Sequence, residues 1–141
     1  VSSAASDVYK RQLFGLLMIK HFIVDLGLQQ YIGPSDKHRY FSSMAHYHYA
    51  QHGLATLLVC LVVVLPVEIA ILIGVVDYII HWHIDYCKHH FNSAIGAVGH
   101  SRKWWWTNVL DQCLHTATYW IITMTVLSWP VAMHLVPAIY V

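Results

Sequence analysis

Four apolar segments separated by polar stretches dominate the pattern of this 141-residue chain. They predict helices over about residues 13–30, 49–65, 67–88 and 106–129. The apolar run at 53–80 is too long for one helix across a hydrocarbon core of about 30 Å, at ~1.5 Å per residue, and short for two. Pro66 offers a place to turn, so we predict a tight hairpin there, with one long helix kinked at Pro66 as the alternative.

The two ends of the chain are set apart from this pattern. Residues 1–12 resemble the translated sequencing-adapter read-through found at the ends of metagenomic gene models, and we predict that they are not part of the fold. The true start is then upstream or at Met18. At the other end, residues 131–141 form an apolar tail that we expect to lie on or in a membrane.

The composition indicates that these apolar segments are membrane spans and not the core helices of a soluble protein. The chain is 57% hydrophobic and 11% charged, with a mean hydropathy of +0.50, which is too apolar for an ordinary soluble domain. We therefore predict an all-α integral membrane bundle of four transmembrane helices, with the lipid bilayer as its partner. The net charge of +1 shows no basic excess, which argues against nucleic-acid binding. Three scattered cysteines form no C-x-x-C pair and are expected to be buried.

The distribution of lysine and arginine predicts the orientation. Lys37 and Arg39 fall between the first two helices, and Lys88, Arg102 and Lys103 in or beside the last loop, whereas the Pro66 hairpin has none. By the positive-inside rule, loops 31–48 and 89–105 are cytoplasmic, and the expected location is a bacterial inner membrane. Three consecutive tryptophans at 104–106 suit the headgroup level.

The chemistry is concentrated in ionisable residues spaced four apart within the predicted helices. The pairs are His21 and Asp25, His48 and His52, His81 and Asp85, and Asp111 and His115. A spacing of four puts both side chains of a pair on one helix face. Under the predicted topology these residues lie roughly 5 to 15 Å from the cytoplasmic helix ends. We therefore expect one shared polar centre in the cytoplasmic half of the bundle.

Imidazole nitrogen and carboxylate oxygen together suit a divalent metal such as Zn, Fe or Mn. The candidate ligands are His21, Asp25, His52, His81, Asp85, Asp111 and His115. They exceed what one ion needs, so either two ions bind or some residues orient the ligands. Further donors near the same layer are Gln29, Gln30, Gln51, Lys88 and Gln112. A metal-dependent membrane hydrolase acting on a lipid-like or membrane-delivered substrate is one hypothesis, with Asp25 or Asp111 as the catalytic base.

Two non-hydrolytic hypotheses compete with this one. Interhelical polar contacts of about 0.6 to 2 kcal/mol each can simply fix helix packing, as in a non-enzymatic bacterial or phage accessory protein. Histidine and carboxylate can also form a proton relay. Lys20 is expected either to extend to the membrane surface, which we favour, or to pair with Asp25.

The ordered motifs resemble a known family. They are His21-Phe-Ile-Val-Asp25 followed by Gln29, the His48 and His52 pair, His81-Trp-His-Ile-Asp85-Tyr-Cys-Lys88, and Leu110-Asp111-Gln112-Cys-Leu-His115. Over about residues 13–127 they look like the domain-of-unknown-function family 3307 of small bacterial and phage polytopic membrane proteins. The resemblance implies a four-helix membrane protein with these polar positions and no established activity. A looser similarity is to membrane-bound metal-dependent hydrolases.

Overall fold

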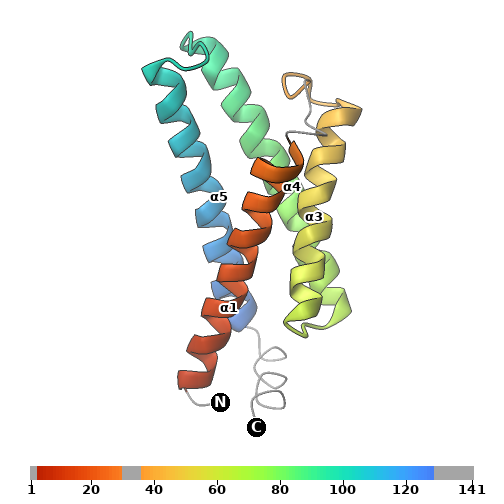
Figure 1. Ribbon diagram of the computed structural model, residues 1–141. Helices are drawn as coiled ribbons and strands as arrows, with labels where there is room; N and C mark the ends of the chain where they lie inside the picture. Colours follow the sequence, from red (N-terminus) through yellow and green to blue (C-terminus); the bar gives the residue numbers. More distant parts are fainter. Residues whose placement is uncertain (1–2, 30–35, 129–141) are drawn as a thin grey trace.

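The computed structural model describes residues 3–29 and 36–128, and within these ranges every regular element is helical. The elements are α1 (Ser3–Phe22), which continues as the π-helical segment η1 (Ile23–Leu28), α3 (Ser43–Val62), α4 (Val67–Ala94) and α5 (Arg102–Ser128). The prediction of an all-α fold with four helices is confirmed for the described residues. Figure 1 shows the helices running lengthwise, with the α3–α4 turn at one end and the α4–α5 loop at the other.

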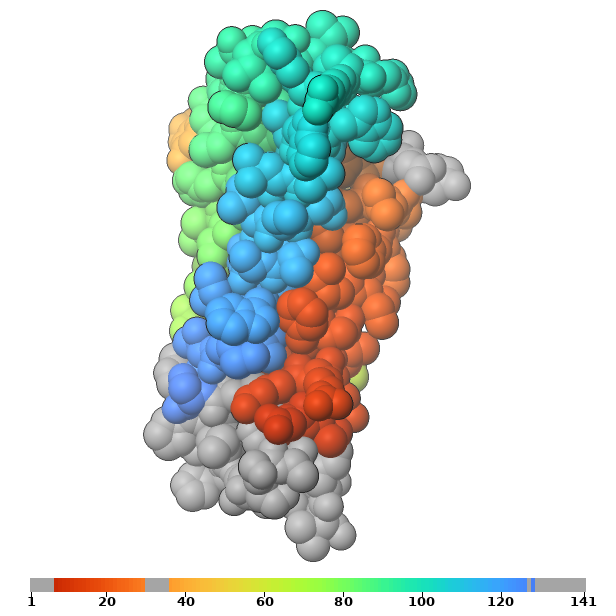
Figure 2. All heavy atoms as spheres, turned by 90° about the vertical axis from the view of Figure 1, so that its left-hand side faces the viewer, coloured from red at the N-terminus to blue at the C-terminus, as the bar shows by residue number. Residues whose placement is uncertain are grey.

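Each helix packs against two neighbours. α1 contacts α3 and α5, and α4 contacts the same two helices. Figure 2 shows α5 with α1 along one side and α4 along the other. The loop before α3 lies at the same end as the α4–α5 loop, so the two basic loops share one end of the bundle, which we call the loop end (Figure 1).

The chain reverses between α3 and α4 at residues 63–66. The Leu65 amide donates to the Cys60 carbonyl at 3.0 Å, and Val64 takes a left-handed conformation with φ of 62°. Pro66 then precedes α4, where its missing N–H costs no helical hydrogen bond. This turn lies where the sequence suggested a hairpin and replaces the alternative of one kinked helix.

The helices extend farther than apolarity suggested. α3 begins at Ser43, capped by the Ser42 hydroxyl that accepts from the Ala45 amide, and α4 continues to Ala94. The added turns are polar and aromatic, so the apolar pattern did not include them although their backbone is helical. α1 includes part of the segment set aside, and Tyr9 donates to the Val63 carbonyl at 3.0 Å. The predicted tail at 131–141 lies outside the described residues.

The bundle is apolar inside at the turn end and polar inside toward the loop end. The apolar core comprises Tyr9, Leu13, Leu17, Cys60, Leu65, Ala70, Ile73, Tyr119, Ile122 and Val126. Beyond it the buried side chains are mainly histidine, aspartate, lysine and threonine, whereas large apolar residues such as Leu54, Leu72 and Ile121 are about half exposed. Charge inside and hydrocarbon outside is the reverse of a soluble domain.

Among the described helices, α4 alone is long and apolar enough to cross a membrane by length and composition. The prediction of four membrane-spanning helices is therefore not confirmed. The expectation that all three cysteines are buried is also wrong, since only Cys60 is buried and Cys87 and Cys113 are exposed.

Two glycines bring α3 and α4 into backbone contact. A Cβ built on Gly53 would lie 2.7 Å from the Gly74 carbonyl oxygen, and one on Gly74 would lie 2.8 Å from the Gly53 oxygen. Small residues at such a crossing let two helices approach closely, as in membrane bundles. Because His52 and Asp77 are close in sequence to these glycines, the contact also sets their positions along the helix axes at the interface between α3 and α4.

We expect Gly74→Ala to lower the free energy of unfolding by about 1–3 kcal/mol, because the new methyl group overlaps the α3 backbone. Thermal unfolding in detergent, followed by circular dichroism, measures the change. Gly15→Ala is the matched control, since a Cβ at Gly15 meets nothing within 4 Å, and a gain of up to about 1 kcal/mol is expected there. Equal effects of the two substitutions would contradict a close α3–α4 contact.

Candidate metal centre

Eight ionisable side chains converge inside the bundle toward the loop end. They are His21 and Asp25 from α1 and η1, His48 and His52 from α3, His81 and Asp85 from α4, and Asp111 and His115 from α5. We call these eight residues the His/Asp cluster. Each histidine directs its Nε2 atom toward a carboxylate of the cluster, with N–O distances of 3.0–3.8 Å. All but Asp25 are buried, and the Asp25 side chain is 12% exposed.

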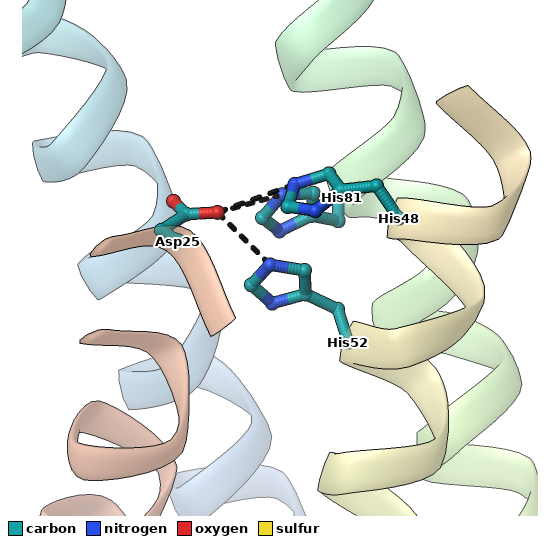
Figure 3. A group of neighbouring side chains, drawn as sticks. All are labelled: Asp25, His48, His52 and His81. Carbon is teal, nitrogen blue, oxygen red and sulfur yellow. Dashed lines mark hydrogen bonds and ion pairs between the residues drawn. The ribbon is translucent and has the colours of Figure 1, made fainter. Parts of the chain in front are cut away.

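Asp25 is at the centre of the largest group of donors. Its Oδ1 atom lies 3.0 Å from His52 Nε2, 3.3 Å from His48 Nε2 and 3.8 Å from His81 Nε2. Figure 3 shows the carboxylate facing these three imidazoles across the space between helices. The ligand atoms of the four residues lie within 4.8 Å of one another. Asp25 belongs to the π-helical segment, a feature that is frequent at functional sites.

The histidine rings form a continuous stack through the cluster. The ring of His81 lies between those of His52 and His115, with centroid distances of 3.6 and 4.1 Å and interplanar angles near 20°. His21 stands 4.9 Å from His115, and its Nδ1 lies 3.2 Å from the Tyr119 hydroxyl. His21, His81 and His115 make a second group of possible ligands that shares His81 with the first.

Two lysines neutralise the other two carboxylates of the cluster. Lys37, in the loop before α3, donates to Asp85 Oδ2, and Lys88 donates to Asp111 Oδ2 at 2.8 Å. Asp111 and Asp85 also lie 3.5 and 3.8 Å from His115 Nε2. The prediction that Lys88 contributes a donor beside the site therefore agrees with the geometry.

A separate buried ion pair lies beside Thr56, one helical turn from His52 toward the α3–α4 turn. Lys20 Nζ donates to Asp77 Oδ2 at 2.5 Å and to the His52 carbonyl at 3.4 Å, and the Thr56 hydroxyl donates to the same Asp77 oxygen at 2.6 Å. The Lys20 ammonium also lies 4.6 Å from the centroid of the Tyr119 ring. Both sequence expectations for Lys20 are wrong, because it neither reaches a surface nor pairs with Asp25. Its partner is 57 residues away in sequence, beyond any helical spacing.

Several buried nitrogens of the cluster have no hydrogen-bond partner. They are both ring nitrogens of His48 and of His81, Nδ1 of His52 and Nε2 of His115. Buried polar atoms are nearly always satisfied, so the unpartnered Nε2 atoms of His48 and His81 beside the Asp25 carboxylate require an explanation. A metal ion accepts such lone pairs, and three imidazoles with one carboxylate suit Zn, Fe or Mn.

The structure brings together all seven residues singled out from the sequence and adds His48. The spacing of four had identified His48, but the helix was placed to start at about residue 49. Because α3 begins at Ser43, His48 lies inside the helix on the same face as His52. Gln112, named as a further donor, donates to Asp111 Oδ2 at 3.3 Å, and its Oε1 atom accepts from His21 Nε2 at 3.2 Å.

Comparison with known proteins agrees with the motifs. A family model described as a protein of unknown function (DUF3307) matches residues 13–139. The chain belongs to this family. The match covers all eight residues of the His/Asp cluster and begins after the segment set aside at residues 1–12. No curated protein and no solved structure matches the chain.

The buried pair below the cluster gives a prediction for stability. Lys20→Met leaves Asp77 charged in an apolar interior, and we expect a loss of about 3–5 kcal/mol in the free energy of unfolding. In the double variant Lys20→Met/Asp77→Leu no charge remains unpaired, so most of the loss should be recovered. Denaturant unfolding in detergent measures both. Lys10→Met, which removes an exposed pair with Asp7, is the control with little expected change.

Additive losses in the two-residue variant would contradict the pairing of Lys20 with Asp77, because two independent sites add their effects.

Proposed function

We propose that this protein is an integral membrane protein that binds one divalent metal ion, Zn, Fe or Mn, through Asp25, His48, His52 and His81. The observation that carries the proposal is the set of three buried Nε2 atoms within 3.8 Å of a single Asp25 oxygen. These residues come from three separate helical segments (Figure 3). A ligand set assembled from different elements is typical of metal sites in helix bundles.

The distribution of charge favours this position for the ion. Of the four carboxylates that lie between the helices, three pair with a lysine, namely Asp77 with Lys20, Asp85 with Lys37 and Asp111 with Lys88. Asp25 is surrounded by imidazoles, and no lysine or arginine of the described residues forms an ion pair with it. A divalent cation would neutralise Asp25 and bind His48 Nε2 and His81 Nε2, which lack hydrogen bonds.

The proposed activity is metal-dependent hydrolysis. A bound divalent ion makes a water molecule acidic enough to lose a proton near neutral pH. Asp25, one of the two expected bases, lies among the ligands, so Asp111 is the better candidate. It lies 3.5 Å from His115 Nε2, and the His115 ring stacks on that of His81. Asp111 would act as the base and take the proton by way of the His115 ring.

The membrane part of the proposal is supported by the inverted distribution of polarity. Within the most apolar window of α4 only 28% is buried, whereas the core helix of a soluble protein is mostly buried. Large apolar side chains are exposed along α3, α4 and α5 while charges are inside. In a lipid bilayer the exposed apolar side chains would contact acyl chains, and the charged side chains inside the bundle would be kept away from them. The loop end would face the cytoplasm of a bacterial inner membrane, because it carries the basic loops.

Metal analysis tests the central claim. The detergent-purified chain should contain about one ion per chain, and His52→Ala or Asp25→Asn should weaken metal binding by more than the ~10–100-fold seen for supporting residues. His83→Ala is the matched control, since His83 is exposed on the same helix as His81. Asp85→Asn should keep the ion, because Asp85 is already paired with Lys37. Metal-free protein after gentle purification would contradict the proposal and favour a proton relay through the stacked imidazoles.

Cysteine accessibility tests the topology. In a variant with Cys87 and Cys113 replaced by alanine, Asp36→Cys and Ser101→Cys should react with a membrane-impermeant maleimide from the same side of sealed vesicles. Val64→Cys, in the α3–α4 turn, should react only from the opposite side. Buried Cys60 serves as the internal control for unfolding. Labelling of all three positions from one side would contradict a single membrane crossing between each of these loops and the α3–α4 turn.

A further inference from the structure

A groove on the outer face of the bundle leads to the His/Asp cluster between α4 and α5. It has a volume of about 490 Å³, and its apolar walls include Phe91 on α4 and Leu110 and Leu114 on α5. These three side chains are each about half exposed. The groove also contains Lys88 and Asp111, so it joins an apolar outer surface to the carboxylate that contacts His115.

We propose that this groove binds an anionic phospholipid, with an acyl chain along Phe91, Leu110 and Leu114 and the phosphate at Lys88. The inference rests on the proposed function, for which it names the class of substrate. A lipid bound in this way has its headgroup ester bonds next to Asp111 and His115. The cleavage is a hydrolysis, in which water adds to the ester phosphorus or carbon and the alcohol leaves with a proton.

Charge complementarity argues for an anionic headgroup. The Lys88 side chain is 24% exposed, and its ammonium has three donor hydrogens, of which Asp111 accepts one. The loop end of the bundle also carries Lys37, Arg39, Arg102 and Lys103. A phosphate accepts charge-assisted hydrogen bonds from such donors, and a basic surface beside a membrane attracts anionic lipid.

A second groove provides the comparison. It lies between α1 and α5, has a volume of about 690 Å³ and is lined by residues such as Phe14, Val109, Ala117 and Trp120. Its polar lining consists of neutral groups, including Asn108 and Gln112. An acyl chain fits either groove, but an anionic headgroup has a cationic partner in the α4–α5 groove. The proposal therefore predicts selectivity between two grooves on neighbouring faces of α5.

Photo-crosslinking of lipid to the full chain in phosphatidylcholine nanodiscs tests this. The probe is phosphatidylglycerol with a diazirine on one acyl chain, and the comparison probe is phosphatidylcholine with the same chain. We expect the anionic probe to label peptides covering residues 84–91 and 107–114. Lys88→Gln should reduce this labelling by about tenfold, as expected for the loss of one charge-assisted hydrogen bond, and Lys88→Arg should retain it.

Blocking variants keep the test independent of the Lys88–Asp111 pair. Leu114→Trp fills the α4–α5 groove and should abolish labelling there, whereas Ala117→Trp fills the α1–α5 groove and should leave it unchanged. Labelling spread evenly over the exposed helix faces, or groove labelling by both probes regardless of Lys88, would overturn the proposal. Metal content is measured on the same samples. Metal retained without selective labelling contradicts the groove alone, and selective labelling of metal-free protein contradicts the metal site alone.

Discussion

Buried carboxylates inside a bundle with an apolar outer surface have to be neutralised, and this constraint determines how the helices pack. An unpaired charge removed from water costs several kcal/mol even after relaxation. Asp77 on α4 takes its lysine from α1, Asp111 on α5 takes its lysine from α4, and Asp25 of η1 faces histidines of α3 and α4. Each pair joins two different segments, so a shift of any helix by one turn would leave a charge unpaired.

The two halves of the interior therefore contribute differently. At the turn end, apolar packing around Leu13, Leu17 and Tyr119 holds the helices together without directional requirements. Toward the loop end, polar contacts set the register and leave imidazole nitrogens without partners. Ligand-binding sites commonly contain polar atoms without hydrogen-bond partners in the protein, while a well-packed region elsewhere maintains the fold. The Gly53–Gly74 contact lies between the two halves, and it holds α3 and α4 close together on both sides of the contact.

The sequence predicts the members of the cluster better than the contacts among them. A spacing of four identifies a helix face, and a common depth from the loop end places four such faces in one layer, which is why all eight residues were identified and seven were named as ligands. His48 was left out of the ligand set because the start of α3 was set by apolarity instead of by the Ser42 cap. Lys20 and Lys37 find their partners 57 and 48 residues away, and periodicity carries no information about contacts at that range.

Charge pairing also limits how many ions the cluster can hold. Asp85, Asp111 and His115 have ligand atoms close enough for a second metal, but each carboxylate already accepts a hydrogen bond from an ammonium group. A second divalent ion would have to displace Lys37 and Lys88, and their charges would then lie beside the ion at distances where repulsion in a low-dielectric interior is strong. Asp25 has no such competitor among the described lysines. For the proposed metal site, one ion at Asp25, with Asp111 and His115 left for proton transfer next to His81, is therefore the arrangement that would leave the fewest unbalanced charges.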